Sequence, residues 1–499
     1  MNTLTIRTPE TVFSVSIAPG TLLSTVLQAH VPAFALPCAG NHTCGKCRVQ
    51  VSGALAPPDA QEAALLSDTD RAAGIRLACS CRVLGDAEVT LTTQAGARIL
   101  SWNRLPIFDR TESGCGLAAD IGTTTVAVQL IDRPSGRVLA EQLAENRQRG
   151  YGADVISRIE ACKTAGLDTL SDLIADQLEE MAAACMREAG VTQVAEAVVT
   201  GNSTMLYLYE GIDPAALAVV PFTMSTFFGG SSRRTLAGAP VYLPRAIGAY
   251  VGADIVCAIL AADLTRKPGV QLLADIGTNG EMALCRDGQL LCCATAAGPA
   301  FEGAGLSCGM PAARGAIRAV GLDADGRMTY RTVGGAPAVG VCGSGILDAL
   351  AVLLETEQLD ESGYLEDDPC PIGQSGVTLL QKDVRQIQLA KSAVCAGLLT
   401  LLEETGLPAA SVSRFCIAGG FGSSMNPASA SKIGLFPAAL EEKAVFIGNA
   451  ALGGAAMLLM NRALRAESEA LARAASELSL SASPTFMDAY IDCMSFETF

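Results

Sequence analysis

The chain has 499 residues, of which 50% are hydrophobic and only 17% are charged, so it is long enough to fold as roughly two to four domains with large interiors. Its formal net charge of −16 argues against nonspecific binding to nucleic acid, which needs a basic surface, and against docking on anionic membranes. We therefore expect no nucleic-acid partner and no membrane partner.

The first residues give no sign of a secretory signal peptide. Residues 1–7 alternate in polarity like a strand, and they lack a basic region followed by an apolar run. The apolar stretch 447–460 is too short to span a bilayer and is interrupted by Asn449. We therefore expect a cytoplasmic protein, in which the 18 cysteines are thiols or metal ligands rather than disulfides.

Cysteines near the N-terminus have the spacing of an iron–sulfur site. Cys38, Cys44 and Cys47 form a C-x5-C-x2-C pattern, and a distant fourth ligand comes from either Cys79 or Cys81. Plant-type ferredoxins use the close variant C-x4-C-x2-C with a distant fourth cysteine to hold a [2Fe–2S] cluster. A structural zinc site and unliganded thiols are the alternatives, although zinc sites favour paired C-x2-C units and only one such unit is present on this side. We therefore expect a [2Fe–2S] cluster as a cofactor.

The surroundings of these cysteines suit a small β-grasp domain. Residues 4–6, 12–17, 48–51 and 88–92 have strand-like composition or alternation, and Thr21 is placed to cap a short apolar helix. The stretch 96–114 is basic and non-periodic, which is typical of a linker between domains.

Two Asp-Ile-Gly-Thr turns follow the linker, each between two apolar strands. The first comprises Asp120, Gly122, Thr123 and Thr124, and the second comprises Asp275, Gly277, Thr278 and Asn279. Glycine allows the backbone to approach a phosphate, while turn amides and threonine hydroxyls donate hydrogen bonds to it. The aspartates suit Mg²⁺ or an attacking water. The repeated device indicates an internal duplication around a polyphosphate; two ordinary hairpins are the alternative.

Two further glycine-rich elements follow in the second half of the chain. A strand ends at Gly419 and Gly420, where a bare backbone suits a base or ribose lying flat. Gly343 and Gly345 begin an apolar helix whose first amides are suited to binding an anion, although a tight structural turn is an alternative explanation.

Together, the cysteine cluster and the paired turns resemble the reductive activators of corrinoid-dependent enzymes, often called RACE proteins. The likeness extends through residues 149–158, 200–205, 252–255, 381–391 and 433–437, and so covers nearly the whole chain. The chain is short for that family, and His42 is an unusual residue within the cysteine loop. Neither departure removes a ligand or a phosphate motif.

The resemblance implies an α/β architecture in which an α+β β-grasp ferredoxin domain precedes a two-lobed, actin/Hsp70-like (ASKHA) ATPase domain. The expected boundaries are 1–95 for the ferredoxin domain, 96–114 for the linker, 115–265 and 266–465 for the two lobes, and 466–499 for a tail that packs on the ATPase domain. It also favours Cys79 as the fourth cluster ligand. By the same resemblance, Asp120–Thr124 and Asp275–Asn279 hold the phosphates of ATP with Mg²⁺, and residues 417–420 hold its adenosine.

The implied function is ATP-dependent transfer of one electron from the cluster to Co(II) of a corrinoid protein, which regenerates Co(I). An external low-potential electron donor and a homodimer are also implied. The alternatives are activation of a different low-potential metalloenzyme and a small-molecule kinase with an appended redox domain. The kinase would need a carboxylate base, for which Asp154, Asp254 and Asp348 are candidates.

Overall fold

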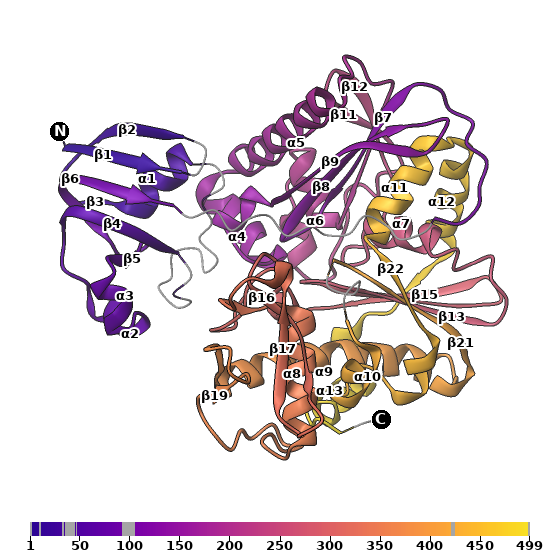
Figure 1. Ribbon diagram of the computed structural model, residues 1–499. Coiled ribbons are helices and arrows are strands. Elements are labelled where there is room, and N and C mark those ends of the chain that lie inside the picture. Colours follow the sequence, from indigo (N-terminus) through magenta and orange to yellow (C-terminus); the bar gives the residue numbers. More distant parts are fainter. Residues whose placement is uncertain are drawn as a thin grey trace. The chain divides into compact units, whose positions relative to one another are not determined.

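The computed structural model describes residues 2–8, 11–31, 34, 45, 47–91, 105–420 and 425–497. The chain forms two compact units, one made of residues 1–96 with 145–174 and the other of 97–144 with 175–499. Figure 1 shows the helices and strands of both units along the chain. The domain boundaries expected from the sequence stay predictions.

The first unit is built on a six-stranded sheet of order β2-β1-β6-β4-β5, with β3 paired to β6. Strand β1 lies antiparallel to β2 and parallel to β6, and β4 is antiparallel to β6. This mixed sheet with a helix on one face has the β-grasp pattern. Its elements are β1 (Asn2–Arg7), β2 (Val12–Ile17), β3 (Thr21–Leu22), α1 (Leu23–His30), β4 (Arg48–Leu55), α2 (Ala60–Leu65), α3 (Asp68–Ala72), β5 (Ile75–Leu77) and β6 (Arg82–Thr90).

A small apolar core joins α1 to this sheet. Leu4, Ile6 and Val89 from the strands and Leu23 and Leu27 from the helix have no solvent-exposed surface. Their alternation along β1 and their i, i+4 spacing along α1 direct them to one interior. The expectation that Thr21 caps α1 was wrong. Its hydroxyl donates to the carbonyl of Ala18, and the helix begins after Leu22 without a side-chain cap.

The first unit also holds the 3-10 turn η1 (Arg147–Gly150), helix α4 (Val155–Ala165) and the first part of α5 (Leu167–Ala189). Asp154 caps α4 through a capping box: its carboxylate accepts from the Ser157 amide at 2.8 Å. Because this carboxylate is engaged in holding the helix start, Asp154 has a structural role at this position.

The second unit contains two six-stranded sheets with the same plan. The first has the order β11-β12-β10-β7-β8-β9, and the second has the order β22-β21-β13-β14-β15-β23. In each, a hairpin (β7–β8 or β13–β14) continues into a further strand, and the first strand of that hairpin also pairs in parallel with a later strand (β10 or β21). The shared plan agrees with the duplication expected from the repeated turns.

The strands of the first sheet are β7 (Cys115–Ile121), β8 (Thr125–Asp132), β9 (Arg137–Glu145), β10 (Ala197–Gly201), β11 (Gly230–Leu236) and β12 (Ala239–Leu243). Those of the second are β13 (Val270–Ile276), β14 (Gly280–Arg286), β15 (Gln289–Thr295), β21 (Val412–Ala418), β22 (Ala444–Gly448) and β23 (Ser476–Glu477). Strands β7 and β13 are central and almost wholly buried, which explains their continuous apolar sequences.

Two buried helices connect the sheets of the second unit. Helix α7 (Ala253–Ala261) contacts β10, β13 and β14, and α11 (Ala450–Met460) contacts β7 and β10. The helices lie side by side (Figure 1) and meet so closely that a side chain on Gly454 would clash with the backbone of Cys257. Helix α7 therefore contacts both sheets, and α11 packs on the sheet formed by the earlier part of the sequence.

A further group of elements completes the second unit. It comprises a small sheet of β16 (Ala316–Leu322), β17 (Met328–Thr332) and β18 (Gly340–Val341), a two-stranded ribbon of β19 (Cys370–Pro371) and β20 (Thr378–Leu379), and the helices α8 (Gly343–Glu355), α9 (Gln381–Glu404), α10 (Pro427–Lys432), α12 (Ala463–Ala474) and α13 (Pro484–Asp492). Helix α6 (Ser203–Tyr209) follows β10 in the first sheet.

Polar contacts attach the C-terminal segment to α9. The buried ammonium of Lys391 donates to the carbonyl of Cys493 at 2.6 Å and to that of Ser495, and it lies 5.1 Å from the centre of the Phe496 ring. Gln388 donates to the carbonyl of Met494 at 2.8 Å. None of the described helices has the length and apolar character needed to cross a membrane.

Candidate functional site

The two Asp-Ile-Gly-Thr turns meet in the second unit. The hydroxyl oxygens of Thr124 and Thr278 lie 2.7 Å apart, although the residues are separated by 154 positions. Asp120 and Asp275 occupy equivalent places, one residue before the ends of β7 and β13. The Asp120 charge contributes to the raised pKa of Asp275, so the two carboxylates are also within electrostatic range. The structure thus brings together the two motifs that the sequence predicts to hold phosphate.

Four carboxyl groups gather behind these turns. Asp254 at the start of α7 and Glu281 in β14 join Asp120 and Asp275. Burial raises the pKa of Asp120 to about 6 and that of Asp275 to about 7, the latter with repulsion from Asp120 and Glu302. Burial and the charges of Asp120 and Asp275 raise the pKa of Asp254 to about 8. Such a cluster favours a positively charged ligand, because cations relieve both desolvation and mutual repulsion.

Two asparagines hold the polar groups of the first turn. Asn449 donates to the Asp120 carboxylate at 2.9 Å, and Asn202 donates to the Thr123 hydroxyl at 3.0 Å. Each asparagine also caps a helix: the Asn449 side chain accepts from the Leu452 amide in α11, and that of Asn202 accepts from an amide in α6. Because each side chain is bonded at both ends, the orientation of the first turn is fixed by two helix starts.

The second turn is held by neighbouring backbone and by Glu302. The Thr278 hydroxyl donates to the Glu302 carboxylate at 3.2 Å, and the backbone carbonyl of Thr278 accepts from the Gly298 amide at 2.9 Å. The Gly277 amide donates to the Asn279 carbonyl at 3.2 Å. Gly122 similarly requires the absence of a side chain, because a Cβ there would lie 2.7 Å from the Thr125 carbonyl oxygen. The turns are therefore tight, as the glycines predict.

Gly419 brings the third motif against the second turn. Its φ is +97°, and a Cβ at this position would clash with the Ile276 carbonyl and lie 3.0 Å from a carboxylate oxygen of Asp275. Gly420 follows directly. Only glycine combines this dihedral with this close approach. Three of the four predicted nucleotide motifs therefore adjoin one another.

The fourth motif lies at the start of α8, against the small sheet. A Cβ on Gly345 would clash with the Ile317 carbonyl in β16, and the Ser344 hydroxyl donates to the Arg318 carbonyl at 2.9 Å. Close packing of helix on strand therefore accounts for the glycine at 345. A role of Gly343 and Gly345 in anion binding stays a prediction.

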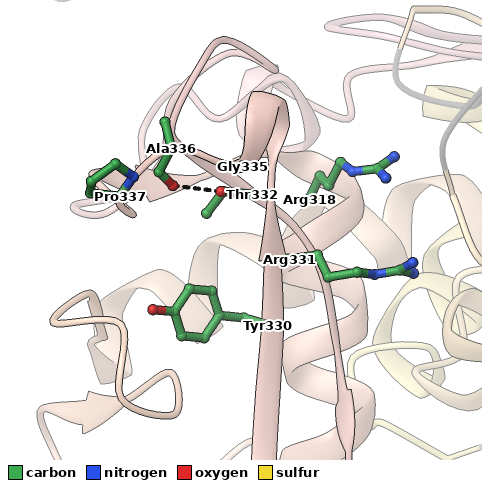
Figure 2. A pocket seen from close by; sticks show the side chains of 7 residues that line it. All are labelled: Arg318, Tyr330, Arg331, Thr332, Gly335, Ala336 and Pro337. Atoms are coloured by element: carbon green, nitrogen blue, oxygen red, sulfur yellow. Dashed lines mark hydrogen bonds between the residues drawn. The ribbon is translucent and has the colours of Figure 1, made fainter.

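Figure 2 shows a surface pocket on the same small sheet. The side chains of Arg318 and Arg331 extend to one side of the sheet, and the Tyr330 ring extends to the other. Burial raises the pKa of Asp348 overall, although a hydrogen bond from Ser429, one from the Val320 amide at 3.2 Å and the charge of Arg331 act in the opposite direction. Of the three aspartates considered as a kinase base, only Asp254 therefore joins the carboxyl cluster.

The first unit brings two predicted cluster ligands into neighbouring segments. The Ala78 amide donates to the Cys47 carbonyl at 2.9 Å, and Cys79 is the next residue. Both cysteines are almost fully buried, at 4% and 3% exposure. Cys38 and Cys44 lie outside the described residues. Cys81 lies near Arg76 and Glu62 in the interior, and burial raises the pKa of its thiol to about 11. The choice between Cys79 and Cys81 as the fourth ligand stays a prediction.

A buried ion pair orients the segment that carries Cys79. The Glu62 carboxylate accepts two hydrogen bonds from Arg76, each of 2.8 Å, and a third from the Leu77 amide at 2.7 Å. The two side chains are 0% and 9% exposed. Since both charges are desolvated and fully bonded, the pair fixes β5 relative to α2.

Sequence reasoning did not assign four polar residues of the nucleotide site. They are Asn202, Glu281, Glu302 and Asn449. Asn202 and Asn449 each lie between a strand and a helix, which is the usual place of an N-cap, so the sequence carried a signal for both. Glu281 also carried a signal, because it is a charged residue within the apolar strand 280–286.

Comparisons with known protein families agree with a cysteine site in the first unit and a nucleotide site in the second. Residues 8–84 match the family of 2Fe-2S iron-sulfur cluster binding domains, residues 115–267 match the RACo middle region, and residues 269–498 match the C-terminal, ASKHA domain of RACo. The fold and its two sites therefore define an ASKHA-type ATPase domain joined to a [2Fe–2S] ferredoxin domain.

Two individual relatives identify the family to which the chain belongs within this class of protein. The chain is 30% identical over 440 residues to the corrinoid activation enzyme RamQ of Eubacterium limosum, covering 80% of this chain and 72% of that protein. It is 26% identical over 424 residues to the [Co(II) methylated amine-specific corrinoid protein] reductase of Methanosarcina barkeri, covering 77% of each. The chain belongs to the family of reductive activators of corrinoid proteins.

A solved structure extends the likeness to nearly the whole molecule. A reductive activator for a corrinoid, iron-sulfur protein superposes with a TM-score of 0.71 at 29% identity, and the match covers 99% of this chain and 98% of that one. The match to this relative therefore spans the regions that all three family models match.

Proposed function

We propose that this chain uses ATP to drive the transfer of one electron from a [2Fe–2S] cluster to Co(II) of a corrinoid protein, so that the acceptor becomes Co(I). Two relatives are named for corrinoid activation and for reduction of a Co(II) corrinoid protein, which supports the choice of acceptor. The observation that carries the proposal is the 2.7 Å contact between Thr124 and Thr278, because it joins the two phosphate motifs into one site.

The residues of the nucleotide site divide into those that face phosphate and those that balance charge. Thr123, Thr124 and Thr278 supply hydroxyl groups, and the turn amides supply further donors. The backbone at Gly419 and Gly420 leaves room for the nucleoside. Closing the two turns on one triphosphate would pull β7 and β13 together, which is a direct way for ATP to change the conformation of the second unit.

The carboxyl cluster fits Mg²⁺, which prefers oxygen ligands and accepts one or two carboxylates together with water. Asp120 and Asp275 are the residues that would hold it, directly or through water. Bound there, Mg²⁺ would neutralise phosphate charge. Asn449 and Glu302 would keep the two turns in place around it.

The cysteine segments fit a [2Fe–2S] cluster, with Cys38, Cys44, Cys47 and Cys79 as its ligands. The bond from Ala78 to the Cys47 carbonyl supports this set, since it places the third and fourth ligand segments together. The cluster would supply one electron at a potential near that of plant-type ferredoxins, about −400 mV. For one electron, every ~59 mV of unfavourable gap to the acceptor shifts the equilibrium tenfold. ATP-dependent changes in affinity for the two states of the corrinoid partner would offset that gap.

The proposal includes an external low-potential donor that reloads the cluster, a homodimer and a cytoplasmic location. The family likeness supports the first two, and the many cysteines, which form no disulfide among the described residues, support the third. No other partner is required.

The test is an anaerobic reduction assay with a purified Co(II) corrinoid protein. We expect about two irons per chain in the purified protein, as for one [2Fe–2S] cluster, and formation of Co(I) that depends on a reductant and on ATP. The double variant Thr124→Val with Thr278→Val should keep the iron and lose the ATP-driven formation of Co(I). Co(I) formation at the same rate and extent without ATP would contradict the proposal. Phosphorylation of a small molecule in place of corrinoid reduction would favour the kinase alternative.

A further inference from the structure

Two buried cysteines meet where the C-terminal segment lies against α9. Cys395 belongs to α9, and Cys493 directly follows α13. Neither side chain has solvent-exposed surface. The Cys395 thiol is hydrogen-bonded to the Cys493 sulfur. Two sulfur atoms from segments far apart in the sequence are therefore close neighbours in the interior.

The surrounding contacts hold these two segments together. The Lys391 ammonium, one turn before Cys395 on the same face of α9, donates to the carbonyl of Cys493 at 2.6 Å. The Ser392 hydroxyl donates to the carbonyl of Tyr490 in α13. The position of Cys493 relative to α9 is therefore fixed by polar contacts at and before this residue.

The two thiols differ in their tendency to ionise. The hydrogen bond from Cys395 lowers the pKa of Cys493, and the positive charge of Lys391 acts in the same direction. The same hydrogen bond, together with burial, raises the pKa of Cys395 well above its ordinary value. Because the thiolate is the nucleophilic form of cysteine, Cys493 is suited to attack an oxidant and Cys395 to resolve the product.

Helix α13 is the element that must move to admit a small oxidant. None of its residues is buried, and Met487 and Ile491 are 50% and 65% exposed. A helix that buries little surface near a chain end opens at a much lower cost in free energy than the whole domain does. Opening of α13 therefore exposes Cys493 while the remainder of the second unit stays folded.

We propose that Cys395 and Cys493 form a reversible disulfide in response to peroxide, and that this disulfide fastens the C-terminal segment to α9. The Cys493 sulfur attacks one oxygen of hydrogen peroxide and becomes a sulfenic acid as the O–O bond breaks. The Cys395 sulfur then attacks the Cys493 sulfur and releases water. Overall, the thiols lose two electrons and two protons, and the peroxide gains both to give two water molecules. A small dithiol reverses the change.

This inference goes beyond the function proposed above and does not rest on it, because neither cysteine belongs to the nucleotide site or to the predicted cluster ligands. In a reducing compartment, disulfides are usually transient and redox-sensing. Helix α9 also contacts β14, β15 and the 3-10 turn η3 (Pro299–Glu302). A covalent link to α9 therefore ties the chain end to an element that packs on the second sheet.

The test maps disulfides by mass spectrometry in the full-length holoprotein, which is treated anaerobically with hydrogen peroxide and then blocked with N-ethylmaleimide. Trypsin places the two cysteines in peptides 392–414 and 474–499, neither of which contains another cysteine. We expect these peptides to be cross-linked in the oxidised protein and separate after treatment with dithiothreitol. The peroxide dose is kept below the one that bleaches the visible absorbance of the holoprotein.

Substitutions separate the roles of the two sulfurs. In Cys395→Ser, the sulfenic acid on Cys493 should persist and be trapped by dimedone, whereas in Cys493→Ser the Cys395 thiol should stay unmodified. Both variants should lose the cross-link, and Cys185→Ser should keep it. Cys185 is a matched control, because it is also fully buried in a helix but lies in α5. Cys395→Ala repeats the test without a buried hydroxyl if Cys395→Ser fails to fold.

Hydrogen exchange provides a second readout. The amides of α13 should exchange more slowly after oxidation and return to their original rate after reduction. Absence of the cross-link at every peroxide dose that leaves the visible absorbance intact would overturn the proposal. Unchanged exchange in α13 despite the cross-link would overturn the fastening of the chain end.

Discussion

Asn449 donates a hydrogen bond of 2.9 Å to Asp120 across 329 positions of sequence. The same side chain accepts from the Leu452 amide at 2.8 Å and so begins helix α11. One asparagine thereby couples the first phosphate turn to a helix from the far part of the chain. The side-chain nitrogen of Asn449 bonds Asp120, and its side-chain oxygen caps the helix. Substitutions can therefore separate its role in nucleotide binding from its role in folding.

Replacement of Asn449 by alanine should reduce both stability and affinity for ATP. Loss of the helix cap is expected to cost about 1 kcal/mol in the free energy of unfolding. Loss of the bond to a charged group should weaken ATP binding about tenfold. Asn449→Ser is the matched control, because serine caps helices well but is too short to reach Asp120. Urea unfolding and calorimetric titration with ATP measure the two effects; equal ATP affinity in Asn449→Ser and wild type would contradict the role of the Asp120 bond.

Gly419→Ala should disrupt the nucleotide site far more than an alanine at another positive-φ glycine. At Gly419 the left-handed backbone costs about 1–2 kcal/mol, and the clash with the Ile276 carbonyl adds about 1–3 kcal/mol. Gly406 also has a positive φ, +63°, but a Cβ there meets nothing within 4 Å. Gly406→Ala should therefore show only the backbone cost and normal ATP binding. Similar losses of stability in the two variants would show that close approach at Gly419 is unimportant.

Asp275 should make the nucleotide-free protein less stable as pH rises. Its pKa is raised from 3.8 to about 7, so between these values the folded state keeps a proton that the unfolded state has lost. Stability therefore falls from about pH 4 to pH 7 and then levels. Asp275→Asn should remove this penalty, so the variant should gain stability over the wild type at pH 8 and gain less at pH 5. Melting temperatures with EDTA at pH 5 and pH 8 measure the change.

Asp360 is a control for which we expect the pH dependence of stability to have the opposite sign. Its pKa is lowered, chiefly by the hydrogen bond from Ser362, and its carboxylate also accepts from the Tyr364 amide at 2.8 Å. Asp360→Asn should therefore lower the melting temperature more at pH 8 than at acidic pH. If Asp275→Asn and Asp360→Asn both raised the melting temperature at pH 8, the cause would be the general reduction of negative charge and not the buried carboxyl cluster.

Glu62→Ala should lower the stability and the iron content of the first unit more than removal of a surface charge does. It leaves Arg76 buried without its partner, which is expected to cost about 3–5 kcal/mol. Because the pair orients the segment before Cys79, iron content and visible absorbance should also fall. Glu88→Ala breaks the exposed pair with Arg7, whose side chains are 43% and 48% exposed, and should change stability by less than about 1 kcal/mol. Full iron retention in Glu62→Ala would contradict this account.

The elements with strong local signals were predictable from sequence. Asp120 and Asp275 end continuous apolar runs before glycine and threonine, and these patterns gave the strands, the turns and the pairing of two similar halves. The family resemblance supplied the order of domains and the chemistry of the cofactors. The duplication predicted two turns around one polyphosphate, but not the direct contact between Thr124 and Thr278.

The rest depends on tertiary contacts that no local pattern encodes. Glu281 belongs to the site because β14 lies beside β13 and α7, and Asn449 belongs to it because α11 returns to β7. For Gly345 the sequence could not distinguish a helix start that binds anions from one that packs on β16. In each case the deciding neighbour is distant in sequence.

The contact of α7 with α11 constrains how the second unit changes shape. Gly454 brings the two helix backbones together at Cys257, so the helices cannot approach further and can separate only by losing buried apolar surface. Any side chain at position 454 should therefore force the two helices apart and lower the stability of the second unit.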